Sequence, residues 1–282
     1  MQVFGYIRFS YLGRSDARMS RVPGATQDDY FQRLFDPLRM ETRFHFFEKI
    51  CLPSIKAQTD QDFTIFIMAS QDMPDPYKTR LEASVAEVPQ IRVCYSDVPN
   101  ILHAFRPVVK ELTAKLTDNS VHFRMDDDDA IGADLIANLR KMARHAEPGT
   151  LLSLPRGFHL FSHKGRPYLL PKVEAFIAIG FAFVNAPDSM RNPYASAHQK
   201  AFHRVPSMME PRPHSYIHVA HASADTREMH NKRVARQLKN IPDYDTAEFQ
   251  ERLKMDFSAA FPHTSLDEIY EAVLSSPDAV SN

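Results

Sequence analysis

Four consecutive aspartates, Asp126 to Asp129, follow directly on the apolar run 120–125 and are the strongest chemical signal in the sequence. Carboxylates this close repel one another unless a cation or several hydrogen-bond donors compensate their charge. Mg²⁺ and Mn²⁺ prefer oxygen ligands, and Mg²⁺ commonly takes one or two carboxylates and leaves its other positions to water and substrate phosphates. The run therefore predicts a divalent-metal site that is closed by a nucleotide.

A solvated acidic turn would also account for the aspartates, because carboxylates are favourable near the N-terminal end of a helix and a helix is expected to begin near Ala133. An EF-hand loop does not fit. Counting from Asp126, Ala130 and Ala137 stand where an oxygen donor and a glutamate are required, and counting from Asp127 puts Asn138 at the last position.

The elements that must position these carboxylates follow from hydrophobic periodicity. In the first 150 residues, short apolar runs alternate with amphipathic segments, which indicates a parallel sheet covered by helices. Strands are expected at 2–9, 62–70, 91–96, 120–125, 150–161 and 173–184. Helices are expected at 30–58, where Pro37 and Pro53 should interrupt the helix, and at 75–87, 104–116, 132–146, 227–240 and 264–274. The aspartates thus fall at the carboxyl end of a strand, where open α/β sheets bind their ligands.

Composition limits the possible partners. The 282 residues carry 34 Lys and Arg against 35 Asp and Glu, so no overall basic field attracts nucleic acid. Cys51 and Cys94 lie in apolar segments and are expected to be free, buried thiols. The N-terminus does not have the pattern of a signal peptide, and the apolar run 175–184 is about half the length of a bilayer-spanning helix. These features favour a cytoplasmic protein.

A second segment carries a family resemblance. "SIKAQTDQDF", with Ser54, Ile55, Gln58, Thr59 and Phe63, resembles the helix that leads into the second strand of family 2 glycosyltransferases of the GT-A fold. Those enzymes end the fourth strand with an acidic run, as "MDDDD" does here. "RFSYLG", "MPDPYK" and "RMDDDDA" resemble more closely the bacterial family named "putative rhamnosyltransferase". The resemblance implies an α/β, GT-A (Rossmann-like) fold with a mixed, mainly parallel sheet and a helical C-terminal region.

The resemblance also implies roles for particular residues. Asp126, Asp128 and Asp129 are expected to be catalytic, with Asp126 and Asp128 as the D-x-D pair and Asp128 as the direct ligand of Mn²⁺ or Mg²⁺. Asp127 and Asp129 are expected to support the run. A histidine from the C-terminal region completes the metal site in some GT-A enzymes, and His221 is the candidate. Contacts with the nucleotide-sugar are expected from the residues Arg8, Ser10, Ser70, Asp72 and Asp127.

The sequence leaves several assignments open. "MASQDMPD" departs from the paired acids that many relatives carry after the second strand, so the base that is recognised is not defined. An inverting transfer needs a carboxylate to deprotonate the acceptor hydroxyl, and Glu174, Glu210 and Asp225 are all candidates. The insertion 10–29 holds Arg14, Arg18 and Arg21, which fit either a lid over the diphosphate or a solvated loop.

The resulting hypothesis is a metal-dependent glycosyltransferase that moves a sugar from a nucleotide-sugar donor to a saccharide or glycolipid acceptor during surface polysaccharide or glycolipid synthesis. Its GT-A domain is expected at 1–225, with the donor half at 1–130, the acceptor half at 131–225 and a helical extension at 226–282. The basic helix 227–240 predicts weak peripheral contact with the inner face of the membrane. The alternatives are a non-catalytic nucleotide-sugar-binding or scaffolding protein and a metal-dependent phosphohydrolase.

Overall fold

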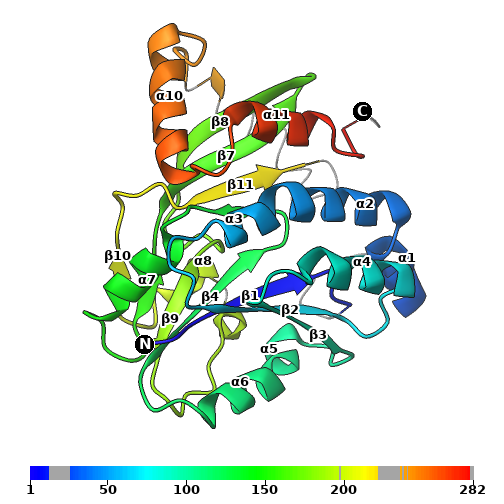
Figure 1. Ribbon diagram of the computed structural model, residues 1–282, viewed down its shortest axis with the longest axis vertical. Coiled ribbons are helices and arrows are strands. Elements are labelled where there is room, and N and C mark those ends of the chain that lie inside the picture. The colour runs from blue at the N-terminus through cyan, green and yellow to red at the C-terminus, as the bar shows by residue number, and fades with distance from the viewer. Residues whose placement is uncertain (13–25, 197, 222–235, 237, 240, 280–282) are drawn as a thin grey trace.

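A seven-stranded sheet runs through the larger part of the molecule, in the order β10-β6-β9-β4-β1-β2-β3 (Figure 1). The computed structural model describes residues 1–12, 26–196, 198–221, 236, 238–239 and 241–279. The strands of this sheet are β1 (Val3–Phe9), β2 (Thr64–Ser70), β3 (Ile91–Ser96), β4 (Ser120–Asp126), β6 (Leu151–Ser153), β9 (Phe181–Asn185) and β10 (Ser207–Met209). Strand β9 pairs antiparallel with β4 and β6, and the other pairings are parallel. The expected mixed, mainly parallel α/β fold is confirmed.

A smaller sheet lies beside it, in the order β5-β11-β7-β8. Its strands are β5 (Ala130–Ile131), β7 (Arg156–His163), β8 (Arg166–Val173) and β11 (Tyr216–Ala220). Strand β5 begins four residues after β4 ends, so the acidic run is the connection between the two sheets. Any side chain on this connection can contact both.

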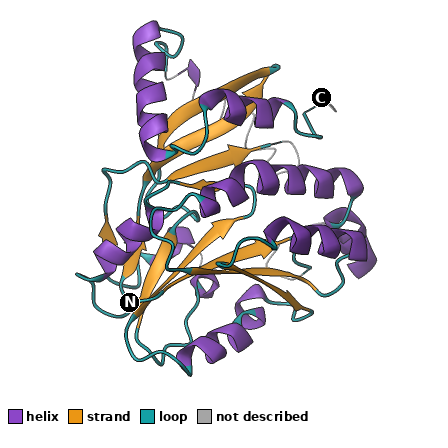
Figure 2. Cartoon of the chain, in the orientation of Figure 1, coloured by secondary structure: helices purple, strands orange, loops and turns teal. Residues whose placement is uncertain are grey.

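Helices cover both faces of the large sheet (Figure 2). The helices of the described residues are α1 (Gln27–Leu34), α2 (Pro37–Phe46), the π-helix η2 (Phe47–Cys51), α3 (Leu52–Lys56), α4 (Asp75–Val85), α5 (Ile101–Ala104), α6 (Arg106–Thr113), α7 (Leu135–Ala143), the 3-10 helix η3 (Pro193–Ala195), α8 (His198–Ala201), α10 (Ala247–Ala260) and α11 (Leu266–Leu274). Helices α5 and α6 pack on one face through Phe105 and Val109. Helices α2, α3, α4 and α7 pack on the other face.

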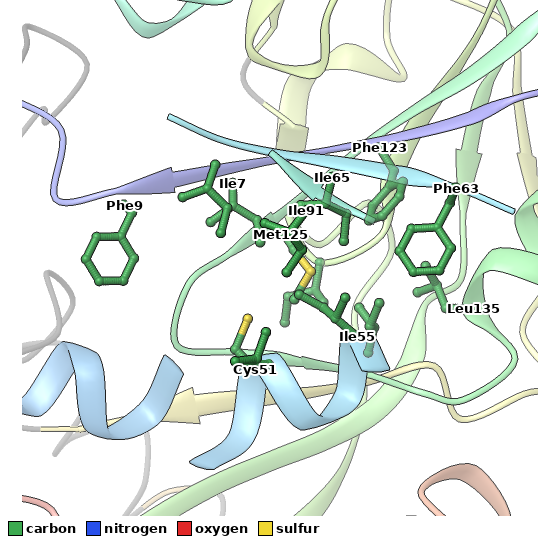
Figure 3. Packing of buried hydrophobic residues seen from close by; sticks show 14 of the residues in the cluster. Ile7, Phe9, Cys51, Ile55, Phe63, Ile65, Ile91, Phe123, Met125 and Leu135 are labelled. Carbon is green, nitrogen blue, oxygen red and sulfur yellow. The ribbon is translucent and has the colours of Figure 1, made fainter. Parts of the chain in front are cut away.

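The segment from α2 to α3 is buried between the two sheets (Figure 1). Phe44, Phe47 and Cys51 belong to the core of the large sheet, where Cys51 and Ile55 face strands β1, β2 and β4 (Figure 3). Phe46 and Ile50 belong instead to the core of the small sheet. The run "FHFFEKICL" is apolar because it packs against both sheets, while Lys49 stays exposed.

Three expectations about the elements need correction. The predicted strand 150–161 divides into β6 (Leu151–Ser153) of the large sheet and β7 (Arg156–His163) of the small sheet. Pro37 does begin a new helix, but at Pro53 the chain stays helical, because the π turn Phe47–Cys51 connects α2 to α3. The predicted strand 173–184 was wrong over its first half. Residues 174–180 form a turn that ends at Gly180 with φ +76°, a value that glycine adopts readily, and only Phe181–Asn185 is a strand.

Gly132 permits the close approach that joins the acidic run to the small sheet. Its N–H donates to the Ser215 carbonyl at 2.8 Å, and a Cβ at this position would lie 2.8 Å from the His214 carbonyl oxygen. Strand β5 then pairs antiparallel with β11 through Ala130 and Ile217. The four aspartates precede β5, so they lie beside the residues with which β11 ends.

Helices α10 and α11 close the outer face of the small sheet. Phe257 of α10 and Val273 of α11 are buried with Phe158 and Leu169 of its strands. A capping box begins α11, because Glu268 N–H donates to Ser265 Oγ and the Glu268 carboxylate accepts from Ser265 N–H. Among the described residues, no helix has the length and apolar character that crossing a bilayer requires. Most of the predicted basic helix 227–240 lies outside the described residues.

Candidate active site

The four aspartates differ sharply in their surroundings. Asp126 is the last residue of β4 and the most exposed of the three whose side chains form ion pairs, with 37% exposure against 1% for Asp127 and 14% for Asp128. Asp129 is also buried. A solvated turn is therefore the wrong interpretation of the run. Helix α7 begins at Leu135 after Asp134, and the aspartates point into the protein instead of capping it.

Asp127 forms a buried ion pair with Arg43 of α2. Burial raises the pKa of Asp127 to about 6, although the Arg43 guanidinium opposes the rise. Its Oδ1 accepts from Arg43, and its buried Oδ2 has no hydrogen-bond partner among the described residues. This carboxylate therefore fastens the acidic run to the helix between the sheets.

Asp128 contacts His221, which follows β11. The distance from Asp128 Oδ2 to His221 Nε2 is 3.1 Å. The other ring nitrogen, Nδ1, lies 3.2 Å from Oδ2 of Asp278, near the C-terminus. Burial opposes ionisation of both partners, but the hydrogen bond between them holds the pKa of Asp128 well below its usual value and raises that of His221.

Asp129 accepts a hydrogen bond from the Val219 N–H at 2.8 Å. Burial raises the pKa of Asp129 well above its usual value, and the neighbouring Asp128 and Asp126 raise it further. The bond extends the contact between β5 and β11 by one residue toward the acidic run. Asp129 therefore holds β11, and with it His221, beside Asp128.

The residues predicted to contact the nucleotide-sugar lie at the carboxyl ends of β1 and β2. Arg8 is half-buried and stands in register with Asp126 on the neighbouring strand β4. Ser10 is buried, has φ +42° and accepts from Arg39 at 3.3 Å, so the chain turns sharply where β1 ends. Ser70 is buried, with its Oγ accepting from the Asp72 N–H at 3.2 Å, and Asp72 itself is exposed.

Arg124 lies next to Asp126 and packs on Tyr194. Arg124 Nη2 lies 3.1 Å from Asp126 Oδ1, so Arg124 is an ion-pair partner of the acidic run. Its guanidinium also stands over the Tyr194 ring at 4.6 Å, and this ring stacks on Phe105 at 5.6 Å. Burial raises the pKa of Tyr194 to about 12, and its hydroxyl has no hydrogen-bond partner among the described residues.

Of the two candidate bases that the structure describes, Glu174 and Glu210, Glu174 is the one within electrostatic range of His218. Lys172 contacts both Glu174, at 2.9 Å, and His218, at 3.2 Å. His218 is within electrostatic range of Glu174, Asp128 and Asp126, and its pKa is lowered to about 4, first by burial and then by Lys172. Glu210 is paired with Arg212 at an exposed position, and Asp225 lies outside the described residues, as do Arg14, Arg18 and Arg21.

The donor set fits a divalent cation completed by a substrate. Within the described part of the chain, no three His, Cys, Asp or Glu side chains are gathered closely enough to enclose a metal ion. Asp128 and His221 nevertheless supply an oxygen and a nitrogen 3.1 Å apart, and Asp126 faces solvent on the same short segment. Two or three protein ligands leave positions for phosphate oxygens and water, as is common for Mg²⁺.

Sequence reasoning missed the roles of Arg43, Lys172 and Asp278. Arg43 had only a weak signal, because its helix also carries Arg39, Glu41 and His45. Lys172 also had a weak sequence signal, since it is a charged residue between the apolar residues Pro171 and Val173. Asp278 had none. It stands in a short polar segment after the last helix, which the sequence alone suggests is a frayed tail.

The mixed, mainly parallel sheet and the acidic run at the end of β4 are the arrangement expected of a nucleotide-sugar transferase of the GT-A class. The chain matches the family described as "Putative rhamnosyl transferase" over residues 2–233, and it belongs to that family. It is therefore a glycosyltransferase, which confirms the expected enzyme class.

Similarity to individual proteins is distant. No curated protein matches the chain. Staphylococcus aureus TarS 1-349, solved in complex with UDP-GlcNAc, has a TM-score of 0.47 at 11% identity, covering 97% of this chain and 82% of that one. A "putative nucleotide-diphospho-sugar transferase" from Desulfovibrio desulfuricans G20 has a TM-score of 0.36 at 14% identity, covering 95% and 100%. A "Putative Glucose-1-Phosphate Thymidylyltransferase" from Bacillus anthracis has a TM-score of 0.41 at 11% identity, covering 83% and 95%.

Proposed function

We propose that this glycosyltransferase uses Mn²⁺ or Mg²⁺ to bind a nucleotide-sugar and transfers the sugar to an acceptor hydroxyl of a saccharide or glycolipid. The observation that carries the proposal is the contact between Asp128 and His221, which joins the acidic run to β11 at the carboxyl end of the parallel sheet. Asp128 and His221 would hold the ion, with Asp126 beside them. When bound, the cation would stabilise negative charge on the diphosphate as the glycosidic bond breaks.

The remaining residues of the site would bind and orient the substrate. Arg8 carries a guanidinium suited to bidentate contact with a phosphate, and it lies in register with Asp126. Ser10, Ser70 and Asp72 lie at the ends of β1 and β2, where they would contact the nucleoside. Asp127 and Asp129 are buried against Arg43 and Val219, so they support the run from behind.

Glu174 is the carboxylate we assign to deprotonation of the acceptor hydroxyl. It is partly exposed, with its side chain at 23%, and its pairing with Lys172 orients it next to His218. A general base needs such access to the reacting hydroxyl. Contact with the inner face of the membrane remains a prediction from the sequence, because the basic segment 227–235 lies outside the described residues.

A thermal-shift series tests the proposal. Nucleoside diphosphates should raise the melting temperature in Mn²⁺ or Mg²⁺ and leave it unchanged in EDTA. A ligand at one hundred times its dissociation constant stabilises a protein by about 2.7 kcal/mol, which gives a measurable shift. An equal shift in EDTA would remove the metal from the proposed function. Release of free sugar from a panel of nucleotide-sugars, measured with the same samples, would then identify the donor.

A further inference from the structure

A carboxylate from the end of the chain contacts the candidate metal ligand His221. Asp278 Oδ2 lies 3.2 Å from His221 Nδ1, and its Oδ1 accepts a hydrogen bond from Ser276 Oγ at 2.8 Å. The side chains of His221 and Asp278 are only 4% and 5% exposed. Asp278 lies well beyond residue 233, where the family match ends. This contact is therefore no part of the segment that defines the family.

The path of the C-terminal segment explains how Asp278 reaches the site. Helix α11 packs on the small sheet, and near its end the Ala272 carbonyl contacts His45 Nε2 of α2 at 2.7 Å. The next residue of α2, Phe46, has its ring 4.7 Å from the His221 ring. Helix α2 thus contacts both the C-terminal helix and His221. The same helix holds Asp127 through Arg43, so both sides of the site depend on it.

The two nitrogens of His221 face two different carboxylates, and their roles differ. An ionised carboxylate only accepts hydrogen bonds, so without a cation each nitrogen donates to the carboxylate that it faces. A cation at Nε2 would take the place of the proton on the Asp128 side, while the proton on Nδ1 would stay hydrogen-bonded to Asp278. Histidines that bind metal almost always donate their other N–H to a carboxylate, a carbonyl or water, which fixes the tautomer and the ring orientation.

We propose that Asp278 is a positioning residue that holds His221 with its proton on Nδ1 and its Nε2 directed toward Asp128. The C-terminal segment 276–279 is, on this proposal, part of the active site. The proposal rests on the proposed function, because a proton on Nδ1 matters for the site only if Nε2 binds the cation. Ser276 contributes indirectly, by fixing the second oxygen of Asp278.

The test compares Asp278→Asn with Asp267→Asn, which changes an exposed acid on α11. The amide of the first variant can donate to Nδ1 and so favours the tautomer with the proton on Nε2. Binding of Mn²⁺ is measured on the full chain without donor, by the electron paramagnetic resonance of free Mn²⁺. We expect Asp278→Asn to weaken Mn²⁺ binding by roughly 10- to 100-fold and Asp267→Asn to leave it unchanged.

A second measurement does not need the metal. In protein with ¹⁵N-labelled histidine, the His221 resonances should report a protonated Nδ1 in the wild type and a displaced Nδ1 signal in Asp278→Asn. Unchanged Mn²⁺ affinity together with unchanged His221 resonances would overturn the proposal. Should the wild type bind no Mn²⁺, the metal part of the proposed function has failed, and the resonances alone decide the role of Asp278.

Folding of the variant is controlled separately. Circular dichroism shows whether Asp278→Asn retains its structure. If it does not, Ser276→Ala replaces it, because this change removes only the hydroxyl that fixes Asp278 Oδ1. It should weaken Mn²⁺ binding less, but in the same direction. No change in Mn²⁺ affinity or in the His221 resonances for Ser276→Ala would then count against the proposal.

Discussion

Arg43 and Asp127 form an ion pair between the helix that separates the two sheets and the acidic run that connects them. Their side chains are 12% and 1% exposed, so both charges are largely removed from water. Breaking a buried pair by removing one partner leaves an uncompensated charge, which costs much more than the pair contributes as a whole. The pair therefore couples the stability of the fold to the position of the aspartates.

Arg43→Met is expected to lower the free energy of unfolding by about 3–5 kcal/mol, the range for a broken buried ion pair. Arg92→Met is the matched control. It removes an exposed pair with Glu111, at 3.4 Å, and should cost less than about 1 kcal/mol. Urea titration of both variants measures the difference. Equal losses of unfolding free energy in the two variants would show that burial does not make the Arg43–Asp127 pair more costly to break than an exposed pair.

Asp128→Asn is expected to abolish the stabilisation that a nucleoside diphosphate gives in Mn²⁺. The amide is a much poorer ligand for a hard cation than the carboxylate it replaces. The protein should still fold, since the substitution also removes one of four neighbouring negative charges. Thermal shifts with and without EDTA measure both effects, with the exposed Asp118→Asn as control. A full nucleotide-dependent shift in Asp128→Asn would rule out its role as a ligand.

Glu174→Gln is expected to lower the turnover number by roughly 100-fold or more, the usual effect of losing a general base. Donor binding should not change, because Glu174 is assigned to the acceptor side. Calorimetry of donor binding and initial rates of transfer separate the two quantities. Glu210→Gln, at an exposed pair with Arg212, is the control and should leave the rate unchanged. A Glu174→Gln enzyme of normal rate would return the assignment of the base to Asp225.

His122 gives the fold a pH dependence that is separate from the site. It is buried, its Nδ1 lies 2.7 Å from the Tyr6 hydroxyl, and burial lowers its pKa to about 3. Between pH 6.5 and 3 the unfolded chain therefore binds a proton at this residue that the folded chain does not, so stability falls as pH falls through this window.

The expected loss from His122 is about 2 kcal/mol between pH 7 and pH 5, since one pKa unit corresponds to about 1.4 kcal/mol. Urea titrations at pH 5, 6 and 7 should show that His122→Gln loses stability less steeply than the wild type. His103→Gln, at an exposed position, should follow the wild type. Identical pH dependence for wild type and His122→Gln would mean that His122 does not titrate differently in the two states.

The local pattern of apolar residues was sufficient to predict most strands of the large sheet. The periodicity of residues 1–125 predicted β1 to β4 within about two residues, because apolar alternation and its interruption are properties of neighbouring residues. The position of the aspartates at a strand end also followed from sequence. The turn at 174–180 did not, since its residues are as apolar as a strand and it is the glycine conformation at Gly180 that ends it.

Which residues meet across the site was decided only by the tertiary structure. Asp128 pairs with His221, Asp127 with Arg43, and His221 with Asp278, and each pair brings together residues far apart in the chain. These contacts depend on the pairing of β5 with β11, on the burial of α2 between two sheets, and on the return of the C-terminal segment. The sequence by itself determined the elements and the chemical types of the site, because these are set by neighbouring residues. The partners were set by packing between distant segments, which one sequence does not encode in any local pattern.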